Sequence, residues 1–208
     1  MITLYISNPC IYNESDKIDI SFIPSLIRRR MSQVEKISAW LYNNSQVSTK
    51  DYKTVFSSNH GEWQTTSKLI EHYHYEKEFL PSKFSTSVHN AFCGILSILT
   101  KNRSSYTAIA SGEDSIENGI IEAVLYSCST LFIYADESTP TLYQPYLKTT
   151  PAKGLSFFIS LDKINLDSKP VRVEFINQSK TLMFQEASDF LLYKSTTLTG
   201  KHLKMEYI

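Results

Sequence analysis

Glycine and paired cysteines are scarce in this chain of 208 residues. Only 6 glycines occur, and none builds a GxGxxG or GxxxxGK loop, which excludes the common glycine-rich nucleotide sites. The three cysteines, Cys10, Cys93 and Cys128, are far apart and include no CxxC pair. That pattern disfavours a disulfide framework or a zinc site and fits a reducing cytoplasm. We therefore predict a cytoplasmic protein without a cofactor or a metal.

Excess charge of either sign and long apolar runs are also missing. The 21 basic residues balance the 21 acidic ones, so no basic surplus indicates nucleic-acid binding. No segment approaches the roughly 20 apolar residues of a membrane span, and the first residues lack the basic start of a signal peptide. The remaining composition, 42% hydrophobic and 20% charged, is typical of a globular domain. Zero net charge weakens self-repulsion and favours association with a partner.

Strand-like and helix-like periodicities alternate along the chain. The expected strands cover 2–7, 52–58, 106–111, 128–137, 155–164 and 171–178, and the expected helices cover 25–42, 65–73, 87–99, 113–126 and 181–193. Alternation of this kind predicts an α/β fold with a mostly parallel sheet between helices. The last two strands follow each other without a helix, so we expect them to add an antiparallel edge.

The most informative segment is 81–125, which reads PSKFSTSVHNAFCGILSILTKNRSSYTAIASGEDSIENGIIEAVL. It resembles the core of β-ketoacyl synthases, in which an asparagine–alanine–small–glycine helix precedes an arginine turn, a short strand and the helix that begins with the nucleophilic cysteine. Residues 89–94, Arg103 and 107–111 match the first three of these parts. The cysteine position then falls on Glu113, or on Asp114 if the register is shifted by one residue.

Two further runs strengthen the resemblance. LIRRRMSQVEKISAW and VFSSNHGEWQTTSKLIE are similar to an early helix and to the second strand and helix of the same family. The runs Ser-Val-His-Asn at 87–90 and Gly-Glu-Asp-Ser at 112–115 resemble short ketosynthase-like proteins encoded beside aryl-polyene-type polyketide clusters in bacteria. The resemblance implies a thiolase-like half-fold with a five-stranded, mostly parallel mixed sheet flanked by helices. An additional C-terminal strand pair or helix is expected, and residues 1–208 are expected to form one β-ketoacyl synthase-like N-terminal domain.

The residues for condensation chemistry are missing from this pattern. A condensing enzyme holds its acyl chain on a thiolate, whose pKa a helix N-terminus lowers. The family also draws two histidines, or a histidine and a cysteine, from a second half that this chain is not expected to contain. Its five histidines are His60, His72, His74, His89 and His202, and none lies in an HGTGT-like or GHT-like run.

A glutamate at the nucleophile position keeps the negative charge but cannot serve as the acyl carrier, because a mixed anhydride hydrolyses readily. Chain-length-factor subunits resemble ketosynthases and also lack this cysteine. We therefore expect a non-condensing accessory protein of fatty-acyl or polyene and polyketide biosynthesis, with a ketosynthase or an acyl carrier protein as its partner.

Two other functions stay open at this point. A small acyl-thioester hydrolase or decarboxylase could use Glu113 or Asp114 with His89 as an acid–base pair. The second open function is a homodimer that binds an acyl ligand. Half of a thiolase-like fold leaves an apolar face uncovered, and such a face favours association.

Each candidate residue also has an ordinary structural reading. Acids are common at helix starts, and His89 could cap a helix or stabilise the fold. Residues 28–30, three arginines, could dock an acidic carrier protein or form a solvated surface. Asp136 and Glu137 end a strand, where active sites of open sheets often lie, and they are first expected to shape a turn. No catalytic residue is therefore assigned firmly.

Overall fold

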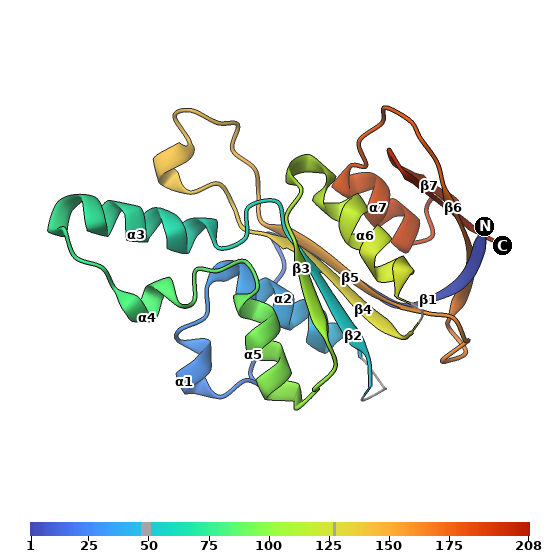
Figure 1. Ribbon diagram of the computed structural model, residues 1–208, viewed down its shortest axis with the longest axis horizontal. Helices are drawn as coiled ribbons and strands as arrows, with labels where there is room; N and C mark the ends of the chain where they lie inside the picture. The colour runs from blue at the N-terminus through green and yellow to red at the C-terminus, as the bar shows by residue number, and fades with distance from the viewer. Residues whose placement is uncertain (47–50, 127) are drawn as a thin grey trace.

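The computed structural model describes residues 1–46, 51–126 and 128–208, which form one large sheet with helices on both faces (Figure 1). The sheet has eight strands in the order β3-β2-β4-β5-β1-β6-β8-β7. The strands are β1 (Ile2–Asn13), β2 (Lys53–Ser57), β3 (Tyr106–Ile109), β4 (Thr130–Asp136), β5 (Lys153–Ser160), β6 (Lys169–Phe175), β7 (Thr197–Thr199) and β8 (Leu203–Tyr207). The helices are α1 (Ser25–Arg28), α2 (Gln33–Asn44), α3 (Trp63–Glu76), α4 (Pro81–Phe84), α5 (Ala91–Thr100), α6 (Ser115–Leu125) and α7 (Phe184–Leu191), with 3₁₀ turns η1 (Gly112–Asp114) and η2 (Thr141–Tyr143).

The expected α/β class, a mixed sheet flanked by helices, is confirmed, but the sheet is larger and more antiparallel than expected. Among the strands that the structure describes, only β2 pairs in parallel on both sides, with β3 on one side and β4 on the other. The pairings of β5, β1, β6, β8 and β7 are antiparallel. The reason is the connection after β4, which contains only the short turn η2 and no crossover helix. A parallel pairing of β4 and β5 would require such a crossover.

Helices cover the two faces of the sheet in pairs, as Figure 1 shows. Helices α2 and α5 pack on one face through a core that includes Ile37, Phe92 and Ile133. Helices α6 and α7 pack on the other face through a core that includes Ile120 and Phe190. Burial of these apolar side chains supplies the main driving force for the fold. The fully buried strand β4 is shared, because its successive side chains enter the two cores alternately.

The helix expected over 25–42 is interrupted. Helix α1 ends at Arg28, and α2 begins after Ser32, which forms a capping box with Glu35. The hydroxyl of Ser32 accepts a hydrogen bond from the Glu35 amide at 3.1 Å, and the Glu35 carboxylate accepts one from the Ser32 amide at 2.8 Å. A reciprocal cap of this kind fixes a new helix start. Arg29 and Arg30 therefore lie in the turn between α1 and α2.

Helices α3 and α4 project away from the sheet as an arm (Figure 1). In α3, all of whose residues the structure describes, only Ser67 is buried. The arm leaves aromatic side chains in solvent, among them Tyr75, Phe79 and Phe84. Within the described parts of the chain, no helix combines the length and apolar character that a membrane crossing requires.

Candidate functional site

The three neighbouring strands β3, β2 and β4 run parallel, so their carboxyl ends meet at one edge of the sheet. Open α/β sheets commonly place ligands and chemistry at this edge. Here the edge contains 58–62 after β2, 110–114 after β3, and 136–137 at the end of β4. We call these segments, together with His89, the strand-end site. Glu113, Asp114, Asp136 and Glu137 lie in it together with His89, whereas the arginines at 28–30 lie at the end of α1 and in the α1–α2 turn.

His89 is held at the end of β3. Its Nε2 donates a hydrogen bond to the carbonyl of Ile109 at 2.8 Å, and its ring packs against Phe56 with centroids 5.5 Å apart. Gly61 covers the other ring nitrogen, because a Cβ at position 61 would lie 2.5 Å from Nδ1. The backbone of Gly61 has φ +58°, in the left-handed region that favours glycine. The fold thus engages Nε2 in a hydrogen bond and leaves no room for a side chain at position 61 beside Nδ1.

The acids at the start of α6 are placed differently from each other. Glu113 is exposed within η1. Asp114 accepts a hydrogen bond from the Lys201 ammonium at 2.7 Å, and this contact lowers the pKa of Asp114. Its second oxygen, Oδ1, is buried without a hydrogen-bond partner among the described residues. Asp114 is therefore tied to the connection between β7 and β8.

A second acid of α6 completes this attachment. Glu117 is 1% exposed and accepts hydrogen bonds from the backbone amides of Lys201 and Leu203, both at 2.8 Å, and of His202. Gly200 allows the close approach, because a Cβ at position 200 would lie 2.6 Å from the Glu117 carboxyl carbon. The start of α6 is thus bound to the hairpin of β7 and β8, which we call the C-terminal hairpin.

His89 and the acids of the α6 start share one edge of the sheet but have separate partners. Between described residues, no hydrogen bond or ion pair joins His89 to Glu113 or Asp114. His89 contacts the end of β3, whereas Asp114 contacts Lys201. A catalytic role for any of the three stays a prediction from the sequence.

Asp136 organises the turn after β2. Its Oδ1 accepts hydrogen bonds from the Ser58 hydroxyl at 2.6 Å and the Asn59 amide at 2.8 Å. Its Oδ2 accepts one from the hydroxyl of Tyr134. Glu137 accepts a hydrogen bond from the backbone amide of Gln64 at 2.9 Å, and Gln64 lies in the first turn of α3. The two acids therefore connect the end of β4 to the segment between β2 and α3.

Glu137 belongs to a group of buried acids with Glu35 and Glu62, two residues that sequence reasoning did not single out. Burial, followed by the neighbouring charges of Asp136 and Glu35, raises the pKa of Glu137 to about 7. Burial and Glu35 raise the pKa of Glu62 to about 8, although Glu62 accepts hydrogen bonds from Ser32 and Thr65. Glu35 has a raised pKa for the same reason of burial.

The raised pKa values of these acids favour their protonated, uncharged forms. Among the described residues, no three histidine, cysteine, aspartate or glutamate side chains are placed to hold a metal ion. Like charges that share a buried site raise one another's pKa. Glu35 could have been noticed in the sequence, because Ser32 and Glu35 have the spacing of a capping box. Glu62 has no comparable local signal.

The cysteines lie away from the start of α6. Cys93 is buried in α5, and burial raises the pKa of its thiol to about 12. Burial also raises the pKa of Cys10 in β1 to about 11. Cys128 is half-buried and lies just before β4. Thiols with raised pKa values are poor nucleophiles, because the thiolate is the reactive form.

Two solved complexes share this fold. A chain of the complex between the ketosynthase ApeO and its chain length factor ApeC, from Xenorhabdus doucetiae, matches with TM-score 0.78 and 17% identity, over 100% of this chain and 99% of that chain. A chain of the AntDE:AntF complex, a type II polyketide synthase acyl-carrier protein with its ketosynthase, matches with TM-score 0.67 and 11% identity, over 85% of this chain and 70% of that chain. The expected thiolase-like ketosynthase fold is therefore confirmed.

Sequence comparison gives the family directly. No curated protein matches the chain. The family model for the N-terminal domain of β-ketoacyl synthases matches residues 6–197, which is nearly the whole sequence. By this match, the chain belongs to the β-ketoacyl synthase N-terminal domain family.

Proposed function

We propose that this protein is a non-condensing, ketosynthase-like subunit of fatty-acyl or polyene and polyketide biosynthesis, and that it acts by pairing with a ketosynthase or an acyl carrier protein. The carrying observation is the start of α6, the place where the family resemblance puts the nucleophilic cysteine. Glu113 and Asp114 occupy it, and Asp114 is bound to Lys201. A carboxylate there cannot provide the stable thioester on which condensation depends.

The comparisons support a partner. One similar chain comes from a complex of a ketosynthase with its chain length factor. That chain is about as long as this one, since the match covers 100% of this chain and 99% of the other. A subunit of this size within such a complex is the arrangement that we propose here. We also propose that residues 1–208 act as one domain, which the continuous eight-stranded sheet supports.

The sheet offers a means of pairing. Strand β3 is the last strand at one end of the sheet, and Tyr106 on it is 41% exposed. An edge strand with open backbone groups can pair with a strand of another chain. The edge strand β3 adjoins the strand-end site, because its carboxyl end leads directly into 110–114.

Co-purification tests the proposal. The tagged chain is co-expressed with the ketosynthase and the carrier protein encoded nearest to its own gene, and we expect at least one of them to be recovered with it. The variant Tyr106→Asp places a charge on the edge strand and should reduce the recovery. Tyr146→Asp changes a tyrosine that is 82% exposed in a loop and serves as the matched control.

Two results would contradict the proposal. The first is a stable homodimer that recovers neither protein. The second is turnover of an acyl-carrier thioester by the purified chain alone, lost in Glu113→Gln, because that result would make the protein an enzyme in its own right.

A further inference from the structure

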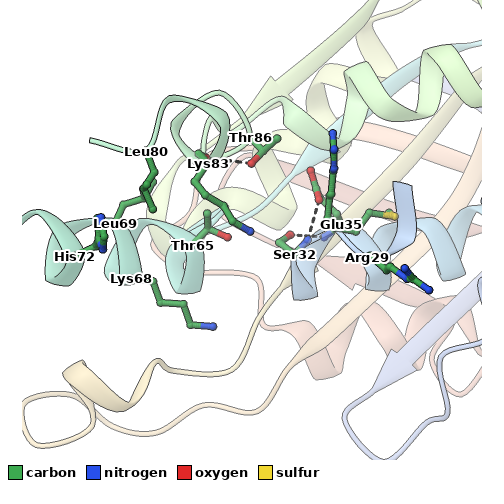
Figure 2. Close-up of a pocket in the computed structure, with 12 residues that line it drawn as sticks. Arg29, Ser32, Glu35, Thr65, Lys68, Leu69, His72, Leu80, Lys83 and Thr86 are labelled. Carbon is green, nitrogen blue, oxygen red and sulfur yellow. Dashed lines mark hydrogen bonds between the residues drawn. The ribbon is translucent and has the colours of Figure 1, made fainter. Parts of the chain in front are cut away.

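A cavity lies between the arm formed by α3 and α4 and the start of α2. It has a volume of about 370 Å³ and lies between the α1–α2 turn, α3 and α4 (Figure 2). Cavities of roughly 300–1,000 Å³ are the usual size of small-molecule sites. Neither the start of α6 nor strand β3 contributes to the lining, so the cavity is separate from the features on which the proposed function rests.

The charges around the cavity favour an anion. Arg29, Arg30, Lys68 and Lys83 line it, and the one acid among the lining residues is Glu35. None of the four cations takes part in an ion pair between described residues. Figure 2 shows Lys83 reaching across from α4 toward Ser32, whereas Arg29 and Lys68 extend toward the outside. Several cations around one concave surface attract negative ligands strongly.

Two buried polar atoms in the lining lack partners within the described structure. They are Oε1 of Glu35 and Nε2 of His72. A buried polar atom without a hydrogen bond costs about 1–3 kcal/mol, so a ligand that supplies the bond gains affinity. Oε2 of Glu35 already accepts from the Ser32 amide. Burial raises the pKa of Glu35, so this carboxyl group opposes a bound anion less than an exposed glutamate would.

Part of the lining is apolar. Met31 is buried, Leu69 is half-buried, and Leu80 is 38% exposed. Figure 2 shows Leu69 and Leu80 together on the arm side of the cavity. An apolar chain placed against them would be removed from water, which is favourable by about 25 cal/mol for each Å² of apolar surface buried.

We propose that this cavity binds a small amphipathic anion, with a carboxylate or phosphate head near Lys83 and Arg30 and a short apolar chain against Met31, Leu69 and Leu80. Carboxylate and phosphate share the chemistry that this lining recognises, namely oxygen acceptors that carry negative charge. All the lining residues named here belong to this chain, so the site can be tested on the isolated protein.

Isothermal titration calorimetry on the intact protein tests the ligand class with four probes. We expect octanoate and octyl phosphate to bind, and the tighter of the two identifies the head group. Octanol has the chain without the charge, and inorganic phosphate has the charge without the chain, so both should bind at least about tenfold more weakly. The proposal is overturned if octanol binds as tightly as the anions, or if neither octyl anion binds at millimolar concentration.

Substitutions test the location. Lys83→Gln removes a cation from the lining and should weaken octyl-anion binding about tenfold or more. Leu69→Ser should weaken it by a smaller factor without changing the preference for anions over octanol. Lys77→Gln removes the same charge from an exposed position of the arm outside the lining and should leave binding unchanged. Equal affinities of wild type, Lys83→Gln and Leu69→Ser would place the anion elsewhere and overturn the assignment.

Discussion

Glu62 is a carboxylic acid whose surroundings oppose its ionisation. It is 4% exposed and lies near Glu35 and Glu137, and its pKa is raised from 4.5 to about 8. In the unfolded chain Glu62 loses its proton near its ordinary pKa, whereas the folded protein retains it until about pH 8. Between these values the unfolded state binds fewer protons, so the free energy of unfolding falls as the pH rises. Glu137 acts in the same direction up to about pH 7.

We therefore expect the melting temperature of the wild type to fall between pH 5 and pH 8, and Glu62→Gln to reduce that fall. At pH 8 the variant should melt about 3–6 °C higher than the wild type, since 1 kcal/mol corresponds to roughly 2–4 °C in a domain of this size. Thermal unfolding followed by circular dichroism across the pH range measures the effect. Glu113→Gln, at an exposed position, is the control. Parallel pH profiles of wild type and Glu62→Gln would refute the assignment.

Gly61 gives a second prediction at the scale of single residues. A side chain at position 61 meets both a left-handed φ of +58° and the His89 ring at 2.5 Å. Gly61→Ala should therefore lower the free energy of unfolding by about 1–3 kcal/mol. Gly94→Ala is the matched control, because no residue that the structure describes lies within 4 Å of a Cβ there and alanine favours the helix by up to about 1 kcal/mol. Denaturant titration that ranks the two variants in the reverse order would contradict this account.

At the scale of elements, the attachment of α6 to the C-terminal hairpin is the contact with the clearest expected energy. Glu117→Ala leaves the backbone amides of Lys201, His202 and Leu203 without their acceptor. A buried donor left unpaired, here the Leu203 amide, costs about 1–3 kcal/mol, and the two partly buried amides add to it. We therefore expect a loss of about 3 kcal/mol in denaturant titration.

Matched variants make this prediction specific. Glu122→Ala removes the same side chain from a half-buried position later in α6 and should have a much smaller effect. Lys201→Met removes only the ion pair with Asp114, whose side chain is 27% exposed, and should also cost less than Glu117→Ala. Equal losses in Glu117→Ala and Glu122→Ala would show that the hairpin does not depend on this acceptor.

Local sequence patterns predicted most of the elements but not where all of them end. The apolar spacing of α2, α6 and β4 is strong enough to indicate their type without tertiary information. The break at Ser32 could also have been recognised, because its capping box is local. No strand was predicted beyond residue 193, so the hairpin of β7 and β8 was not located. Its buried residues Leu198, Leu203 and Met205 are separated by the polar or small residues at 199–202 and 204. These apolar residues are buried because they pack in one core with residues of α7 and β6, a contact that the local sequence does not reveal.

The strand-end site was likewise predictable from the sequence in part. The family resemblance located Glu113 and Asp114 at the start of α6, which the structure confirms as a helix start. Their partner could not be predicted, because Lys201 lies 87 residues from Asp114 and no local pattern joins them. The buried acids were missed for the same reason, since Glu62 and Glu35 come together only when α2 packs beside the β2–α3 connection.

At the scale of the whole molecule, the protein divides into a well-packed body and a weakly packed arm. Helices α2 and α6 each bury several residues against the sheet, whereas α3 buries only Ser67. Regions with few buried contacts open locally at low free energy, and core elements open only near the global free energy of unfolding. Local stability should therefore differ strongly between helices of similar length.

We expect hydrogen exchange of the isolated chain to show this difference. Backbone amides of α3 and α4 should exchange at least about a hundredfold faster than those of α6, which corresponds to a gap of roughly 3 kcal/mol in opening free energy. Strand β4 should be the slowest, because all of its residues are buried and it pairs on both sides. Mass spectrometry of peptides covering 63–84, 115–125 and 130–136 measures the three regions together. Equal protection of the arm and α6 would mean that the arm is held by contacts beyond those seen here, for example by a second chain, and its cavity would then belong to an interface.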